Sequence, residues 1–178
     1  RSFLGGSAGS GKSTTLKTCV VHVRALFKKR GIPAKIELTA YTGVAAFNIG
    51  FGARTACSAF QVFPNAAWKN ELEGSALRKL EDTWHDVALL IIDEISFIGT
   101  SFFARMHFRI QQAKRAYFSE RGLDPSLSTF GRLSMILVGD FGQLEPIDDW
   151  SMCDTEASWA TCPKKLKHLW RHHRYGKH

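Results

Sequence analysis

The chain has 178 residues, of which 44% are hydrophobic and 22% charged, so it can bury the core of one domain and is not a disordered segment. Its four cysteines form no Cys-x-x-Cys pair, which excludes a secreted disulfide scaffold, and its longest apolar run, 87–92, is too short to span a membrane. The formal net charge of +8 is distributed as +8 over residues 1–68, −6 over 69–162 and +6 over 163–178, so total charge alone is weak evidence for a nucleic-acid partner.

Strand and helix patterns alternate along the chain. Residues 3–4 are expected to end a first strand, because a glycine-rich loop follows at once. Residues 13–30 carry apolar side chains at helical spacing and end in three cations before Gly31, which suits a helix C-terminus. The run 87–92 indicates a strand covered on both faces. The other predicted elements are strands over 34–40 and 134–138 and helices over 75–85 and 103–117. This alternation predicts an α/β fold, a parallel sheet flanked by helices with ligands at the carboxyl ends of the strands.

The strongest motif is Gly6-Ser7-Ala8-Gly9-Ser10-Gly11-Lys12-Ser13, which fits G-x-x-x-x-G-K-[ST] and stands directly before a predicted helix. Glycines let backbone N–H groups turn around phosphate oxygens, and the helix N-terminus adds its positive end. Lys12 is expected to reach the β- and γ-phosphates of ATP, and the Ser13 hydroxyl to coordinate Mg²⁺. The alternative is a simple glycine turn before a helix. The predicted nucleotide-binding residues are Gly6, Gly9, Ser10, Gly11, Lys12, Ser13 and Thr14.

Two acids, Asp93 and Glu94, follow the apolar run. Asp93 is expected to face the phosphate loop and hold Mg²⁺, and Glu94 to polarise the attacking water, although adjacent acids after a strand are also common as helix caps. After the next strand, Gln143 could bond a γ-phosphate and sense its loss, and the spacing also fits an ordinary Gly-Asp turn. The predicted catalytic residues are Lys12, Asp93, Glu94 and Gln143, with Ser13 and Asp93 as metal ligands.

Segment 39–47 is a fourth candidate site, with Arg54 beyond it. Hydroxyls and N–H groups at a helix start suit phosphodiester oxygens, and aromatic side chains can stack on bases. From spacing alone, however, a tightly packed helix start is the favoured interpretation.

Together these segments resemble the first RecA-like domain of the Pif/RecD-type branch of superfamily-one DNA helicases. GGSAGSGKST looks like motif I of that family, TAYTGVAAFNI like motif Ia, LLIIDEIS like motif II and LVGDFGQLEPI like motif III. The match covers nearly the whole chain in the family's order, and it implies a P-loop NTPase with a RecA-like sheet. The chain departs from the family at Ala-Cys-Ser 56–58, where Ile-His-Ser is usual, and at Glu145, which replaces a proline.

The resemblance implies ATP-driven, 5′-to-3′ movement on single-stranded DNA and separation of duplex or forked DNA. The processes implied are repair, recombination and telomere or other genome maintenance, in the nucleus or the mitochondrion. Thr42, Gly43 and Ser58 would contact the DNA backbone, and Arg54 is a further candidate DNA-binding residue. An intracellular location also fits a chain that opens without a charged-then-apolar leader, and no membrane partner is expected.

Residues 1–162 are expected to form the RecA-like ATPase domain, with an incomplete first strand. Residues 163–178 are expected to be a basic tail or the start of a linker to a second RecA-like domain, which in this family supplies arginines to the ATP site. Three alternatives stay open: a P-loop kinase, a nucleotide-gated DNA-binding switch or transposon-derived relic, and a zinc module. The zinc module would use Cys153, Cys162, His168 and His172.

Overall fold

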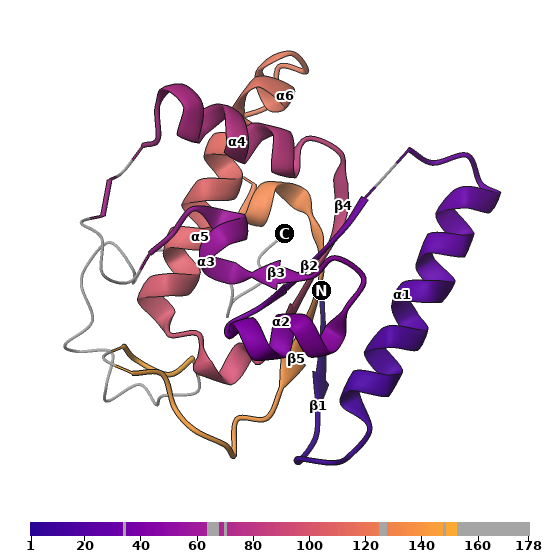
Figure 1. Ribbon diagram of the computed structural model, residues 1–178. Helices are drawn as coiled ribbons and strands as arrows, with labels where there is room; N and C mark the ends of the chain where they lie inside the picture. Colours follow the sequence, from indigo (N-terminus) through magenta and orange to yellow (C-terminus); the bar gives the residue numbers. More distant parts are fainter. Residues whose placement is uncertain (34, 64–67, 70, 125–127, 148, 153–178) are drawn as a thin grey trace, which may run out of the picture.

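Five parallel strands form one sheet, in the order β1-β5-β4-β2-β3 (Figure 1). This computed structural model describes residues 1–33, 35–63, 68–69, 71–124, 128–147 and 149–152. The strands are β1 (Ser2–Gly5), β2 (Lys35–Ala40), β3 (Arg54–Thr55), β4 (Val87–Asp93) and β5 (Ser134–Gly139). The parallel α/β architecture predicted from the alternating pattern is therefore confirmed.

Helices cover both faces of this sheet. They are α1 (Lys12–Lys29), α2 (Gly43–Ile49), α3 (Ala56–Phe60), α4 (Gly74–Trp84), α5 (Thr100–Ala113) and α6 (Arg115–Ser119), with short 3₁₀ turns η1 (Ile95–Phe97) and η3 (Thr129–Arg132). Helices α1 and α2 pack on one face, and α3, α4 and α5 pack on the other. Every helix in the described part of the chain is too short or too polar to cross a membrane.

Strand β4 divides its side chains between the two faces, as its uniformly apolar sequence predicts. Leu90 and Ile92 lie in the core beneath α3, α4 and α5, whereas Leu89 and Ile91 lie in the core beneath α1 and α2. Successive residues of a strand point to opposite faces, so a strand covered on both sides must be apolar at every position. The central position of β4 also places the residue that follows it, Glu94, at the middle of the sheet's edge.

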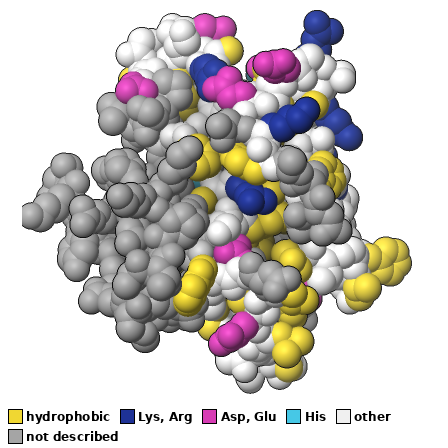
Figure 2. Space-filling view, turned by 90° about the vertical axis from the view of Figure 1, so that its left-hand side faces the viewer, with side chains coloured by type: hydrophobic (Ala, Val, Ile, Leu, Met, Phe, Trp, Pro, Cys, Tyr) yellow, Lys and Arg dark blue, Asp and Glu magenta, His cyan; other side chains and the backbone are white. Residues whose placement is uncertain are grey.

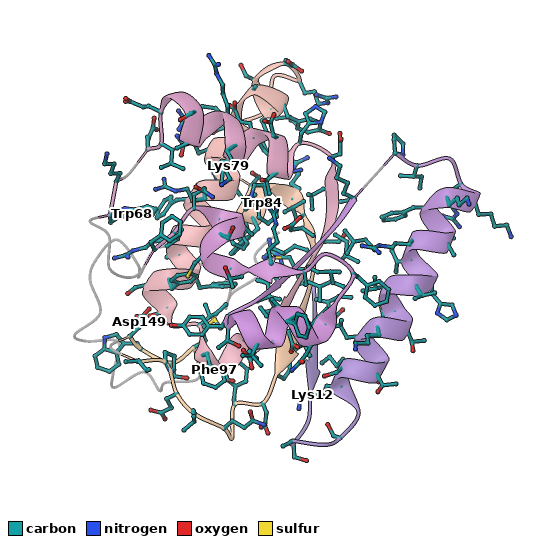
Figure 3. The ribbon with its side chains drawn as sticks, viewed as in Figure 1. Lys12, Trp68, Lys79, Trp84, Phe97 and Asp149 are labelled. Carbon is teal, nitrogen blue, oxygen red and sulfur yellow. The ribbon has the colours of Figure 1, made fainter. Side chains whose placement is uncertain are left out.

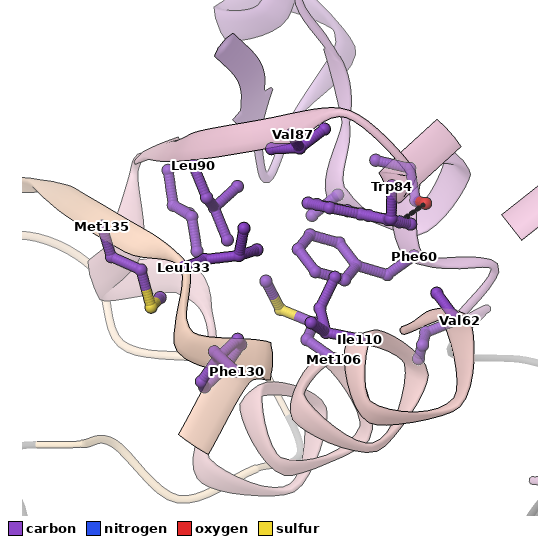
Figure 4. Close-up of a cluster of buried hydrophobic side chains, with 14 of the residues drawn as sticks. Phe60, Val62, Trp84, Val87, Leu90, Met106, Ile110, Phe130, Leu133 and Met135 are labelled. Carbon is purple, nitrogen blue, oxygen red and sulfur yellow. Dashed lines mark hydrogen bonds between the residues drawn. The ribbon is translucent and has the colours of Figure 1, made fainter. Parts of the chain in front are cut away.

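The larger core includes Trp84, which is fully buried at the end of α4 and lies beside Phe60 (Figure 4). Its ring lies 4.6 Å, centroid to centroid, from that of Phe60, and its Nε1–H donates a 3.0 Å hydrogen bond to the Ala59 carbonyl oxygen. The indole therefore fills the space between α3 and α4 and satisfies a buried backbone acceptor.

The predicted helix 103–117 is helical over nearly all its length but is interrupted at Lys114. Helix α5 ends at Ala113, Lys114 departs from helical geometry with φ −101° and ψ 8°, and α6 starts in a new direction. This break buries Phe118 to 1% exposure and leaves Tyr117 47% exposed. The helical spacing of apolar residues could not predict the break, because it does not show that Phe118 is buried in the core in place of Tyr117.

Candidate active site

The candidate site lies where the carboxyl ends of β1, β2, β4 and β5 meet. In register, Gly5 of β1 is paired with Gly139 of β5, and Ala40 of β2 with Asp93 of β4. Parallel strands bring the loops that follow them to one edge of the sheet. Figure 3 shows Lys12 at this edge, beside the start of α1.

The loop between β1 and α1 has the backbone that a phosphate-binding loop requires. Gly9 and Gly11 have φ values of 75° and 86°, a region that favours glycine, and a Cβ at either would meet no atom within 4 Å. Backbone conformation, and not crowding, therefore requires glycine at both positions. The Lys12 ammonium donates hydrogen bonds to the carbonyl oxygens of Gly6 and Ser7, the second at 2.9 Å. The loop thus wraps around one cation, next to the N–H groups at the start of an 18-residue helix.

Asp93, at the end of β4, is the carboxylate best suited to bind a metal ion. Its Oδ1 accepts a 2.9 Å hydrogen bond from the Glu94 N–H. Burial raises the pKa of Asp93; the hydrogen bond from the Glu94 N–H opposes this rise, the charge of Glu94 adds to it, and the charge of Lys12 opposes it. A hard cation such as Mg²⁺ would offset the cost of the buried charge, and the Ser13 hydroxyl in the first turn of α1 offers a second oxygen ligand. The oxygen donors therefore fit Mg²⁺ carried by a nucleotide.

The Glu94 side chain contacts Thr42, at the start of α2. Its Oε2 accepts a 2.8 Å hydrogen bond from the Thr42 hydroxyl and a 3.3 Å bond from the Thr42 N–H. The Glu94 backbone is left-handed, with φ 55° and ψ 40°, which is uncommon for a non-glycine residue. No spacing in the sequence indicates this contact, because the two residues are 52 positions apart.

The loop after β5 holds Gln143 in a tight turn. The Asp140 Oδ1 accepts a 3.0 Å bond from the Gly142 N–H, and the Asp140 carbonyl oxygen accepts a 3.1 Å bond from the Gln143 N–H. The ordinary Gly-Asp turn is thus confirmed as the local structure. Gln143 is exposed, and its role as a γ-phosphate sensor stays a prediction.

Two of the predicted DNA-binding residues stand at the start of α2. The Thr42 hydroxyl accepts a 3.2 Å bond from the Ala45 N–H and so caps the helix, while Gly43 is exposed. The structure thus shows a capped helix start, and contact of Thr42 or Gly43 with DNA stays a prediction. The same helix exposes Val44 and Phe47 to solvent, at 73% and 86%. Solvent-facing aromatic area of this kind is available for stacking.

The other two predicted DNA-binding residues, Arg54 and Ser58, are engaged by the protein. The Arg54 guanidinium pairs with the Glu37 carboxylate, with its Nε–H donating at 2.9 Å. Burial raises the pKa of Glu37, and the Arg54 charge opposes this rise. The Ser58 N–H donates a 3.3 Å bond to the Thr55 hydroxyl at the start of α3. Contact of Arg54 or Ser58 with DNA stays a prediction.

Basic and acidic side chains lie close together on the face opposite α1. On the described part of this face, Figure 2 shows Lys and Arg side chains among Asp and Glu side chains. Among the exposed ion pairs of the chain, Arg115 and Glu71 have a nitrogen and an oxygen 2.6 Å apart. The described part of this face therefore carries mixed charge.

Asp149 is a positioning residue that the sequence reasoning missed. Its carboxylate accepts hydrogen bonds from the N–H groups of Ser101 and Phe102, at 3.2 and 3.0 Å, in the first turn of α5. A carboxylate at a helix N-terminus suits both the unpaired donors and the helix dipole. The loop that carries Gln143 is in this way tied to the helix that follows Glu94.

Among the residues that the structure describes, no group of three or more His, Cys, Asp and Glu side chains could hold a metal ion. A nucleotide-borne Mg²⁺ takes most of its ligands from phosphates and water, so two protein oxygens are enough. The residues of the alternative zinc module, Cys153, Cys162, His168 and His172, lie outside the described residues.

The chain is similar in sequence and in structure to known helicases. The profile of the PIF1-like helicase family matches residues 1–173. The ATP-dependent DNA helicase PIF1 of Xenopus laevis is 33% identical over 166 residues, which is 90% of this chain and 23% of that protein. The crystal structure of Pif1 helicase from Candida albicans is 28% identical, with a TM-score of 0.60, and the match covers 92% of this chain and 34% of that chain.

A Bacteroides Pif1 structure, bound to ssDNA, shares the fold at 24% identity and a TM-score of 0.58, covering 99% of this chain and 33% of that chain. The RecA-like class inferred from the motifs is therefore confirmed. The chain spans between 15% and 25% of the length of the curated relatives named here and their neighbours in the comparison.

Proposed function

The chain belongs to the PIF1-like helicase family, and on that premise we propose that it is the first ATP-binding domain of an ATP-dependent DNA helicase. The observation that carries the proposal is the common sheet edge, where the Lys12 loop meets the carboxylates that end β4. A phosphate loop beside two acids in unlike surroundings is the arrangement that hydrolysis of a nucleoside triphosphate requires.

The proposed roles follow from the positions of the side chains. The loop N–H groups and Lys12 would bind the phosphates, and Ser13 and Asp93 would hold Mg²⁺. Bound Mg²⁺ would neutralise charge that develops on the phosphate oxygens. Glu94 would accept a proton from the attacking water, and Gln143 would report the loss of the γ-phosphate. Two acids, in place of one, favour turnover over mere binding.

Single-stranded DNA is the proposed polymer partner. The Bacteroides relative was crystallised with ssDNA, and helix α2 offers Thr42, Gly43 and the exposed Phe47 ring at the same edge of the sheet as the ATP site. Stacking on an exposed aromatic ring tolerates any base, which suits a motor that moves along DNA. The proposal includes movement in the 5′-to-3′ direction on single-stranded or forked DNA. It also places this activity in genome maintenance, in the nucleus or the mitochondrion.

A second RecA-like domain, downstream of this chain, is proposed to complete the ATP site. Arginines supplied across such a site contribute about 10³–10⁵ in rate. Residues 1–162 would then be the ATPase domain and 163–178 the start of the connection. We expect the 178-residue chain to bind Mg·ATP weakly and to hydrolyse it slowly.

The test is ATP hydrolysis by the full-length parent protein, with and without a single-stranded oligonucleotide, beside its Glu94→Gln variant. We expect turnover that DNA stimulates and that Glu94→Gln reduces by about 10²–10⁴, the usual contribution of a general base. Mg·ATP binding should persist in the variant, because the phosphate loop is untouched. Tight Mg·ATP binding without stimulation in the wild-type protein would refute the helicase proposal and favour a nucleotide-gated switch. Phosphate transfer to an added nucleoside would favour a kinase.

A further inference from the structure

We propose that Thr42 is a positioning residue that holds Glu94 away from catalysis until DNA takes its place. This inference rests on the proposed function, in which Glu94 accepts the proton of the attacking water and α2 contacts DNA. It adds a route by which DNA binding starts ATP hydrolysis.

The contact between the two residues occupies both donors that Thr42 offers. Its hydroxyl and its backbone N–H both bond to the same carboxylate oxygen, Oε2 of Glu94, at 2.8 and 3.3 Å. The hydroxyl oxygen also accepts the Ala45 N–H at 3.2 Å, so the side chain is held in a single orientation. Hydrogen bonds to a charged oxygen are stronger than neutral ones, and they occupy lone pairs that a proton would otherwise take.

The two neighbouring carboxylates have different partners. Asp93 accepts the Glu94 N–H and senses the charge of Lys12, whereas the Glu94 side chain is bonded to Thr42 at the start of α2. The left-handed backbone at Glu94 lets consecutive side chains leave the strand toward different partners. The metal-binding acid and the proton-accepting acid are thus separated by their contacts.

A DNA phosphate and the Glu94 carboxylate would compete for the same donors. Both are anions with oxygen acceptors, and the N–H and hydroxyl of Thr42 cannot serve both at full strength. A phosphodiester oxygen bound at Thr42 would therefore release Glu94. The released carboxylate could then take the proton of a water whose oxygen bonds to the γ-phosphorus, while the bond from that phosphorus to the bridging oxygen breaks.

The test compares DNA-free ATP hydrolysis by the full-length protein and its Thr42→Val, Thr42→Ser and Thr42→Asp variants. Valine keeps the shape of threonine but loses the hydroxyl, and serine keeps the hydroxyl. Aspartate can still accept the Ala45 N–H and cap α2, yet it repels Glu94. We expect kcat without DNA to rise about tenfold for Val and Asp, to stay near wild type for Ser, and KM for ATP to change little.

Controls separate this inference from folding and from the proposed function. Thr83→Val removes a hydroxyl that bonds to the Lys79 carbonyl oxygen within α4, and it should leave the DNA-free rate unchanged. Adding Glu94→Gln to Thr42→Val should abolish the gain. An unchanged or lower DNA-free kcat for Thr42→Val, with normal Mg·ATP affinity, would overturn the inference. If the Val protein fails to fold, Thr42→Asp decides in the same way. A wild-type enzyme that DNA does not stimulate would overturn the proposed function, and this inference with it.

Discussion

Replacing Asp149 with alanine should destabilise the chain by about 2 kcal/mol, because its carboxylate caps α5 from 48 residues away. The nearest residue that could cap this helix locally is Gly99, which has no side chain. Asp149 supplies the missing acceptors for the N–H groups of Ser101 and Phe102. Figure 3 shows it beside the lower end of α5.

The magnitude follows from these contacts. Loss of an N-terminal cap costs about 1 kcal/mol, and loss of a negative charge beside the helix dipole costs about 0.3–1 kcal/mol more. Phe102 is only 8% exposed, so water would replace the lost acceptor poorly there. A loss of this size lowers the midpoint of thermal unfolding by roughly 4–8 °C in a chain of this length.

Urea unfolding of the 178-residue chain and hydrogen exchange of the Ser101 and Phe102 amides would measure the effect. Asp149→Asn, which keeps one acceptor oxygen but no charge, should lose about half as much. Gly99→Ala is an independent control, because its Cβ would lie 2.3 Å from the Asp149 carboxyl group and displace it. A change below about 0.5 kcal/mol in both Asp149→Ala and Gly99→Ala, with unchanged amide exchange, would refute this account of the cap.

Two further predictions concern partly buried carboxylates, Asp93 and Glu37. Burial raises the pKa of Asp93 above its unfolded value, so its ionised form weakens the fold at neutral pH. Asp93→Asn should therefore raise the free energy of unfolding at pH 7. Urea titrations should show this gain fading as the pH falls through the raised pKa of folded Asp93, and it should be gone below the unfolded pKa of about 4; a less stable Asn variant at pH 7 would contradict the prediction. Arg54→Ala should cost about 2 kcal/mol, because it leaves the Glu37 carboxylate, 14% exposed, without its partner. Adding Glu37→Gln should recover part of that loss in a double-mutant cycle, and equal stability of Arg54→Ala and wild type would rule the pairing out as a stabilising contact.

Features that depend on neighbours in the chain could be predicted from the sequence. The Gly6–Ser13 loop, the helix after it and the wholly apolar strand β4 follow from local spacing and burial. The end of α1 also follows from the local sequence: the Ile32 N–H donates a hydrogen bond to the Phe27 carbonyl oxygen, and Gly31 has a φ of 63°. Because strand, loop and helix are consecutive, their order alone placed Lys12 at the sheet edge.

Contacts between distant segments were decided only by the tertiary structure. The bond from Thr42 to Glu94 spans 52 residues, and it forms because β2 and β4 are adjacent in the sheet. Asp149 reaches α5 across 48 residues, and the break at Lys114 depends on which aromatic ring the core accepts. Residue spacing encodes which face of an element is apolar, and it carries no information on which strands become neighbours. The motifs therefore predicted which residues form the site, while strand order and packing decided which partner bonds to each carboxylate.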